Sequence, residues 1–193
     1  MAADKSVWLP LWAGYLEFYQ ASLPSDVTEV TFSRLTGADE DMFGLIAEQD
    51  SRVIGIAHGI LHRSTWARGK YVYLNDLFVS PDARGSGAGR ALIEAIYTRA
   101  DAIGAERVYW LTHESNAAAR KLYDALAVND GFLEYRRWRG PRAAAAAIAR
   151  SRSKASQCST RYAIAQAANA ELVARSAGPR IFRMTRSSPR PAR

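Results

Sequence analysis

The sequence is poor in the features that mark several common classes of protein. Cys158 is its only cysteine, so no disulfide can form within the chain. No group of cysteine and histidine residues has the spacing of a zinc site, and we expect no bound metal. We find no internal repeat and no apolar run long enough to span a membrane. These absences favour a protein of a reducing cytoplasm.

The first apolar run and the two central histidines have ordinary structural explanations. Residues 7–16 are interrupted by Pro10 and Gly14 and follow a single cation, Lys5, so this segment predicts an amphipathic helix rather than a signal peptide. His58 and His62 are four residues apart on a predicted strand, which separates them by more than about 10 Å. They are therefore too far apart to bind one metal ion.

Charge divides the chain into two parts. Residues 141–193 carry eleven cations and one acid, whereas residues 1–140 carry 15 cations and 18 acids. The last 53 residues are rich in Ala, Arg and Ser and contain little large apolar surface. We therefore expect one folded domain over 1–140 and a basic tail over 141–193 that is disordered or marginally helical. No nucleic-acid-binding motif accompanies the cations, and we expect no nucleic-acid partner.

Hydrophobic periodicity predicts an α/β protein in which two helices precede three strands. The third of these strands is followed by a helix, a strand, a helix and a strand. An antiparallel front half followed by a βαβ unit gives a mixed sheet with helices on its faces. The predicted helices are 7–20, 27–35, 88–102 and 116–123, and the predicted strands are 42–48, 52–61, 71–79, 108–112 and 132–138.

A glycine-rich loop joins the third predicted strand to the third predicted helix. It reads Arg84-Gly85-Ser86-Gly87-Ala88-Gly89-Arg90. Glycine lets the backbone approach a ligand closely, and the free N–H groups of the following helix would bind an anion such as pyrophosphate. A Rossmann loop fits less well because its fingerprint has two further residues before the last glycine. A Walker loop is excluded because Gly-Lys-Ser/Thr is absent.

The run LNDLFVSPDARGSGAGRALIEA, residues 74–95, resembles the pyrophosphate-binding motif of the GNAT superfamily of acetyl-CoA-dependent N-acetyltransferases. The likeness continues in Asn116-Ala117-Ala118-Ala119-Arg120-Lys121-Leu122-Tyr123 and covers roughly 8–138. The phrase Tyr-Leu-x-Asp-Leu-Phe-Val is similar to the diamine-acetyltransferase-like branch. The resemblance implies a mixed, mostly antiparallel sheet with helices on both faces. Family members usually have a strand before the first helix, so that strand is missing or the true start lies upstream.

The resemblance also implies the residues of the site. Those that would contact acetyl-CoA are Leu77, Phe78, Val79, Arg84, Gly85, Ser86, Gly87, Ala88, Gly89, Arg90, Asn116 and Tyr123. The backbone N–H of Phe78 or Val79 would stabilise the oxyanion. Tyr123 would be the general acid. Asp76 is the candidate general base, although a structural role for its carboxylate is about as plausible. Glu48 and Glu114 are less specific candidates.

This chain departs from the diamine branch at one position. Asn75 stands where those enzymes usually have a glutamate, and an amide cannot accept a proton at neutral pH. Trp66, Tyr71 and Tyr73 either line the acceptor pocket or belong to the core.

Three functions follow from the resemblance. The first is transfer of acetyl from acetyl-CoA to a primary amine of a small molecule, such as an amino acid or a polyamine, by direct attack in a ternary complex. The second is acetylation of a protein amine, and the third is a CoA-binding module without activity. A homodimer would be ordinary for such a protein.

Overall fold

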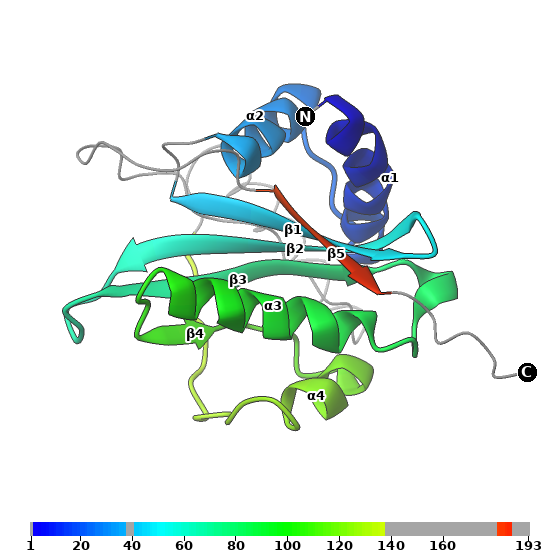
Figure 1. Ribbon diagram of the computed structural model, residues 1–193. Helices are drawn as coiled ribbons and strands as arrows, with labels where there is room; N and C mark the ends of the chain where they lie inside the picture. Colours follow the sequence, from blue (N-terminus) through cyan, green and yellow to red (C-terminus); the bar gives the residue numbers. More distant parts are fainter. Residues whose placement is uncertain (1, 38–40, 138–180, 187–193) are drawn as a thin grey trace, which may run out of the picture. The chain divides into compact units, whose positions relative to one another are not determined.

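The computed structural model describes residues 2–37, 41–137 and 181–186, and the chain divides into two compact units (Figure 1). The first unit comprises Met1–Leu111 with Ile164–Arg193, and the second is Thr112–Ala163. The first unit contains a five-stranded sheet with the strand order β4-β3-β2-β1-β5. Its pairing is antiparallel between β1, β2 and β3 and parallel at both edges, so the predicted mixed sheet is confirmed.

The elements of the first unit follow the predicted order. Helices α1 (Ala2–Phe18) and α2 (Ser25–Thr36) precede the hairpin of β1 (Met42–Gln49) and β2 (Arg52–Arg63). Strand β3 (Lys70–Val79) leads through a 3₁₀ turn (Pro81–Ala83) to α3 (Ala88–Ala102), and β4 (Arg107–Tyr109) follows. No strand precedes α1 in the described residues. None of the described helices is long and apolar enough to cross a bilayer.

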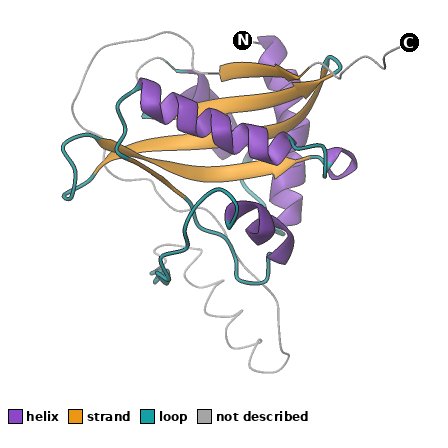
Figure 2. Cartoon of the chain, turned by 60° about the horizontal axis from the view of Figure 1, so that its bottom comes forward, coloured by secondary structure: helices purple, strands orange, loops and turns teal. Residues whose placement is uncertain are grey.

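Helices cover both faces of this sheet, as Figures 1 and 2 show from two directions. On one face, α1 packs its aromatic side chains against Ile46, Ile56 and Phe78 of the strands. On the opposite face, α3 buries Leu92, Ile93, Ile96 and Ala100. Both faces are therefore closed by packed side chains, and only the first combines apolar with polar groups.

A β-bulge in β3 changes which residues face α1. His58 of β2 pairs with Asp76, whereas the next residue, Gly59, pairs with Leu74, so Asn75 is an extra residue in β3. Side chains alternate between the two faces of a strand, and one inserted residue reverses that alternation. The odd-numbered residues before the bulge therefore share a face with the even-numbered residues after it. Asp76 and Phe78 consequently face α1.

In the second unit, α4 (Ala117–Tyr123) is the predicted helix. The strand that we predicted over 132–138 is wrong, because the described residues 128–137 form neither helix nor strand. Phe132 is 85% exposed and Tyr135 is 91% exposed. These aromatic residues suit a strand, but in the described part of the chain they pair with no ladder. Trp138 lies outside the described residues.

The tail contains one described element, β5 (Ile181–Arg186), which pairs with β1. For these six residues the expectation of disorder or marginal helix is wrong, because backbone pairing with an available sheet edge depends little on side-chain composition. The other residues of 141–193 lie outside the described part of the chain.

Candidate active site

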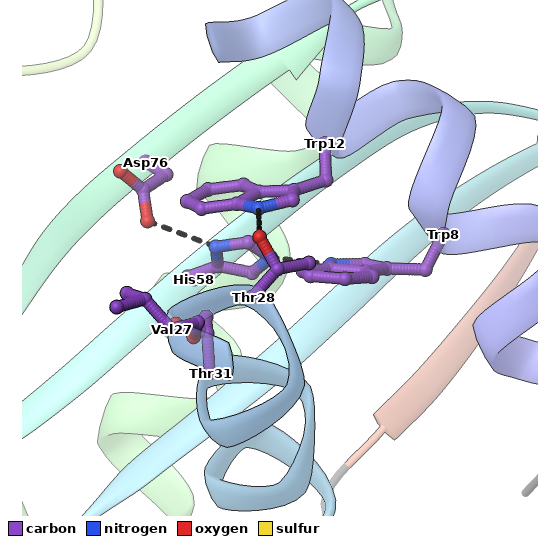
Figure 3. Close-up of polar contacts among 7 residues, drawn as sticks. All are labelled: Trp8, Trp12, Val27, Thr28, Thr31, His58 and Asp76. Carbon is purple, nitrogen blue, oxygen red and sulfur yellow. Dashed lines mark hydrogen bonds and ion pairs between the residues drawn. The ribbon is translucent and has the colours of Figure 1, made fainter. Parts of the chain in front are cut away.

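A buried chain of polar groups crosses the face of the sheet beneath α1 (Figure 3). The Trp8 indole Nε1 lies 2.9 Å from Nε2 of His58, and Nδ1 of His58 lies 2.9 Å from Oδ2 of Asp76. Helix α1 supplies the tryptophan, and the paired strands β2 and β3 supply the other two residues. Trp8 and His58 are each 1% exposed and Asp76 is 5% exposed, so the protein itself must satisfy these groups.

These contacts determine the protonation of His58. An indole N–H can only donate, so Nε2 of His58 must accept and carries no proton. The proton of the neutral imidazole therefore lies on Nδ1 and is donated to Asp76. Because both ring nitrogens are engaged, His58 has no nitrogen left to activate a nucleophile. The contact of its Nδ1 with Oδ2 fixes the position of the Asp76 carboxylate.

The second oxygen of Asp76, Oδ1, is buried and has no hydrogen-bond partner in the described residues. Burial alone raises the pKa of Asp76, but the contact with His58 and then the hydrogen bonds from Tyr15 and Asn75 outweigh it and hold this pKa below its usual range. The carboxylate is therefore ionised at neutral pH. A buried charged oxygen without a partner is costly in a core and is typical of a functional site.

Two tyrosines of α1 lie beside this carboxylate. Burial, followed by the negative charge of Asp76, raises the pKa of the Tyr15 phenol well above its ordinary value. The same two causes raise the pKa of Tyr19. Both phenols therefore stay protonated at neutral pH. Their rings form an edge contact at 4.9 Å, and Tyr15 stacks on Trp12 at 5.4 Å.

The edge of β3 that faces β4 is open beyond Tyr73, because β4 pairs only with Tyr71, Val72 and Tyr73. The N–H of Ser80 donates to the carbonyl of Ile54, which lies in β2. Along a strand, the N–H groups of every second residue point to the same side, so the N–H of Phe78 is also directed toward β2. The N–H groups of Leu77 and Val79 point the other way, to the edge that β4 leaves unpaired. The geometry therefore favours Val79 over Phe78 as the predicted oxyanion donor, and that role stays a prediction.

The glycine-rich loop lies between the end of β3 and the start of α3. Gly85 and Gly87 have φ angles of 81° and 86°, which side chains other than glycine rarely adopt. A Cβ at Gly85 would meet no atom within 4 Å, so the space outside the loop is open. The first hydrogen bond of α3 is donated by Ala91 to Gly87, so the N–H groups of Gly89 and Arg90 precede the helical ladder. This arrangement fits an anionic group.

The structure thus brings most of the predicted cofactor residues together on one continuous strand, loop and helix. The two flanking arginines have contacts of their own: Arg84 lies 5.8 Å from the centre of the Phe18 ring, and Arg90 lies 3.7 Å from Glu94. Both contacts are between exposed side chains and are weak, so either arginine can leave its present partner and bind a phosphate instead.

Asn116 and Tyr123 lie in the second unit, at the two ends of α4. The side chain of Asn116 accepts a hydrogen bond from the N–H of Ala119 at 3.4 Å, so it caps the helix. Capping accounts for Asn116 without any ligand. The roles of Asn116 and Tyr123 toward acetyl-CoA remain predictions.

Sequence reasoning missed His58 as a site residue. We had considered it only as a metal ligand, and no group of three or more metal-binding side chains occurs among the described residues. The available signal was a histidine inside an otherwise apolar strand opposite an aspartate, which becomes informative once the strand register is known. From the sequence, Trp8 and Tyr15 are only apolar positions of the first predicted helix, 7–20.

Comparison with known proteins identifies the family. Residues 8–127 match the family model described as "Acetyltransferase (GNAT) family". A D-amino-acid N-acetyltransferase of Saccharomyces cerevisiae is 36% identical over 136 residues, which are 69% of this chain and 84% of the yeast protein. An uncharacterised N-acetyltransferase of Bacillus subtilis is 31% identical over 135 residues, which are 69% of this chain and 90% of that protein.

The fold agrees with these relatives. A crystal structure of a ribosomal-protein-alanine N-acetyltransferase from Brucella melitensis biovar Abortus matches with a TM-score of 0.59 at 20% identity, covering 72% of this chain and 94% of that one. At this identity the likeness shows the α+β fold alone. The family model and the two sequence relatives carry the conclusion: the chain belongs to the GNAT family of acetyltransferases and is an N-acetyltransferase.

Proposed function

We propose that this enzyme acetylates a primary amine of a small molecule and that this amine donates a hydrogen bond to the carboxylate of Asp76. The observation that carries the proposal is the open Oδ1 of Asp76, a buried and ionised carboxylate oxygen without a partner in the described residues. A protonated or neutral amine is a donor and matches that acceptor. The yeast relative is named for acetylating D-amino acids, which are small amines, and this supports the same class of acceptor here.

The family implies acetyl-CoA as the acetyl donor. Its thioester supplies the activated acetyl group, and the chain would bind its pyrophosphate at the N–H groups of Gly89 and Arg90. Ser86, Gly87 and Ala88 would form the wall of that cradle, with Gly85 keeping the approach open. Arg84 would add a charge-assisted contact.

The reaction also needs a donor for the carbonyl oxygen and an acceptor for the amine proton. The N–H of Val79 at the open edge of β3 would donate to that oxygen, and Leu77 would pair with the pantetheine arm as an added strand does. Because its pKa is lowered, the Asp76 carboxylate binds an ammonium group more readily than it keeps a proton taken from that group. We therefore propose that Asp76 orients the amine and that the amine proton passes to water, directly or through a hydrogen-bonded chain.

Direct attack in a ternary complex fits the site better than a covalent acetyl-enzyme. A covalent route needs a base beside a nucleophile, and both nitrogens of His58 are already engaged by Trp8 and Asp76. Tyr123 would return a proton to the departing thiolate. An acidic second position, as in diamine enzymes, is missing at Asn75, so an amine with one charge suits this site better than a polyamine.

The experiment is free-thiol release from acetyl-CoA by the full chain, with amino acids of both configurations, monoamines, polyamines and a peptide N-terminus as acceptors. We expect release to require a small primary amine, to give the acetamide by mass spectrometry, and to show intersecting initial-rate patterns. Parallel patterns would contradict direct transfer. Release only with the peptide would establish a protein acceptor in place of a small amine.

The same assay tests Tyr123. Substitution Tyr123→Phe removes the phenolic proton but keeps the ring, and we expect kcat to fall by about 100-fold if the hydroxyl protonates the thiolate. Tyr135→Phe, a matched loss of one hydroxyl from a residue that is 91% exposed, serves as the control. Equal rates for Tyr123→Phe and the control would remove Tyr123 from the mechanism.

A further inference from the structure

A second group of side chains lies on the same face of the sheet as Asp76. Along β2, Ile56, His58 and His62 are of one parity and share the face that packs against α1. Tyr71 pairs with His62 in the ladder, and Tyr73 lies two residues further along β3. The bulge at Asn75 is what places these tyrosines on the same face as Asp76. We call Tyr71, Tyr73, Tyr109 and His62 the aromatic strip.

The aromatic strip is one contiguous set of rings. Tyr73 and Tyr109 are ladder partners across β3 and β4, and their ring centroids are 5.0 Å apart with an angle of 35° between the ring planes. The His62 ring makes edge contacts with Tyr109 at 5.7 Å and with Tyr71 at 5.9 Å. Tyr71 is 9% exposed, and the other three rings are partly exposed. The strip is therefore anchored in the core and presents apolar surface.

Hydrogen bonds hold the rings of the strip in place. Nδ1 of His62 lies 2.8 Å from the carbonyl of Arg63, which can only accept, so Nδ1 carries a proton. Nε2 of the same ring lies 3.0 Å from the hydroxyl of Tyr109. Both nitrogens of His62 are therefore engaged within the protein, and these contacts fix the ring between Tyr71 and Tyr109.

The strip begins next to the proposed amine site. Tyr73 lies three residues before Asp76 on β3, about 10 Å at ordinary strand spacing. Tyr73 is also close to Tyr15. The pKa of the Tyr15 phenol is raised mainly by burial and by Asp76, and Tyr73 adds a smaller contribution. A substrate whose amine meets Asp76 can thus extend along β3 and lay the rest of its structure against Tyr73 and Tyr109.

At its other end the strip carries a positive charge. The guanidinium of Arg107 lies over the ring of Tyr71 at 4.8 Å. None of the four residues of the strip is acidic, so a second ammonium group on the substrate would find no carboxylate there and would approach Arg107. Flat apolar groups gain from offset or edge contact with the tyrosine rings.

We infer that the aromatic strip is the specificity surface of this enzyme and selects primary amines that carry an aromatic side chain. The inference rests on the proposed acetylation of a small amine at Asp76 and names the class of that amine. An arylalkylamine or an aromatic amino acid has the required amine and ring. A diamine has the amine but lacks the ring.

The test compares 2-phenylethylamine with ethylamine at saturating acetyl-CoA, using the full chain. The selectivity is the ratio of the two kcat/KM values, and we compare that ratio between wild type and variants because the intrinsic basicity of each amine then cancels. We expect Tyr73→Ala and Tyr109→Ala to lower the ratio by about tenfold. Tyr73→Phe keeps the ring and should retain the ratio.

Tyr97→Ala is the matched control, because Tyr97 lies on α3 and therefore on the opposite face of the sheet. It should leave the ratio as in wild type. Tyr109 is on an edge strand and gives a variant independent of Tyr73 if the latter reduces folding. An unchanged ratio in both alanine variants, or a higher kcat/KM for putrescine than for 2-phenylethylamine, would overturn the inference. Absence of thiol release with every amine would instead contradict the proposed function.

Discussion

The two faces of the central sheet are built from different chemistry. Beneath α3 the buried residues of the helix are all apolar, and Leu92 packs so closely that a Cβ on Gly55 would lie 3.1 Å from its Cδ1. Beneath α1 the tryptophans and Phe78 enclose the pair His58 and Asp76. The two faces differ in whether a charged group is buried.

The difference separates stability from function within one sheet. Apolar burial stabilises the fold at about 25 cal/mol per Å² and needs no special arrangement of partners. Burying a charged group costs free energy unless hydrogen bonds compensate it, so a buried carboxylate often contributes less stability than an apolar side chain of the same volume. The face under α1 has therefore kept a costly group, the carboxylate of Asp76 with its unpartnered Oδ1, and we propose that a substrate amine supplies the missing partner. Substitutions on the two faces should consequently separate folding from catalysis.

The largest combined effect is expected from His58→Ala. This change removes the acceptor of the buried Trp8 N–H and the His58 donor that Oδ2 of the buried Asp76 carboxylate accepts from. We expect the free energy of unfolding to fall by about 3–5 kcal/mol and kcat/KM to fall by more than tenfold. Urea unfolding and thiol release measure the two effects. A variant as active as wild type would show that His58 does not position the carboxylate.

Leu92→Ala should cost similar stability without a similar loss of activity. Leu92 is fully buried under α3, and its truncation leaves a cavity. We expect the free energy of unfolding to fall by about 2–5 kcal/mol, with kcat retained within about threefold at temperatures well below the unfolding midpoint. A selective loss of kcat in the folded variant would mean that the two faces are not functionally distinct.

Gly14→Ala tests the closeness of α1 to the strand that carries Asp76. A Cβ at Gly14 would lie 2.9 Å from the Phe78 ring, so α1 or the ring must shift. We expect a loss of about 1–3 kcal/mol in unfolding free energy. The adjacent Ala13 is exposed, and Ala13→Ser provides a small change on the same helix that should be nearly neutral. Equal stability of the two variants would indicate that α1 packs more loosely.

The smallest expected effect is the pH dependence contributed by Asp76. Its pKa in the folded protein lies below the unfolded value of about 3.9, so its ionised form stabilises the fold above about pH 4, and this contribution is lost as the pH falls through the folded pKa. Wild type should therefore lose stability on acidification to a greater extent than Asp76→Asn. Urea unfolding of both proteins at about pH 7 and pH 3.5 measures the difference. A difference that stays constant with pH would mean that Asp76 titrates normally.

Local patterns sufficed for much of the fold. The glycine-rich loop between β3 and α3 lies as its strand, loop and helix signals predict, and the first two predicted strands, 42–48 and 52–61, form the hairpin of β1 and β2. These features depend on neighbours in sequence, which is why they can be deduced without tertiary structure. The strand predicted at 132–138 was deduced from composition alone, and composition does not supply a pairing partner.

The site was harder to deduce because it depends on register. Asp76 and Tyr73 are three residues apart, and simple alternation places them on opposite faces. The bulge at Asn75 brings them to the same face, and no local signal in the sequence announces it. Likewise, the direction of the Phe78 N–H follows from the bond between Ser80 and Ile54, which only the ladder reveals.

The most direct test of the account is the kcat/KM of Asp76→Asn for the best amine acceptor. The amide keeps the shape of the side chain and can still accept from Nδ1 of His58, but it offers the amine no charged acceptor. We predict a loss of at least about 100-fold, while Asp101→Asn, which removes an exposed carboxylate from α3, stays within about twofold of wild type. A kcat/KM of Asp76→Asn within about threefold of wild type would contradict the assignment of the amine to this carboxylate.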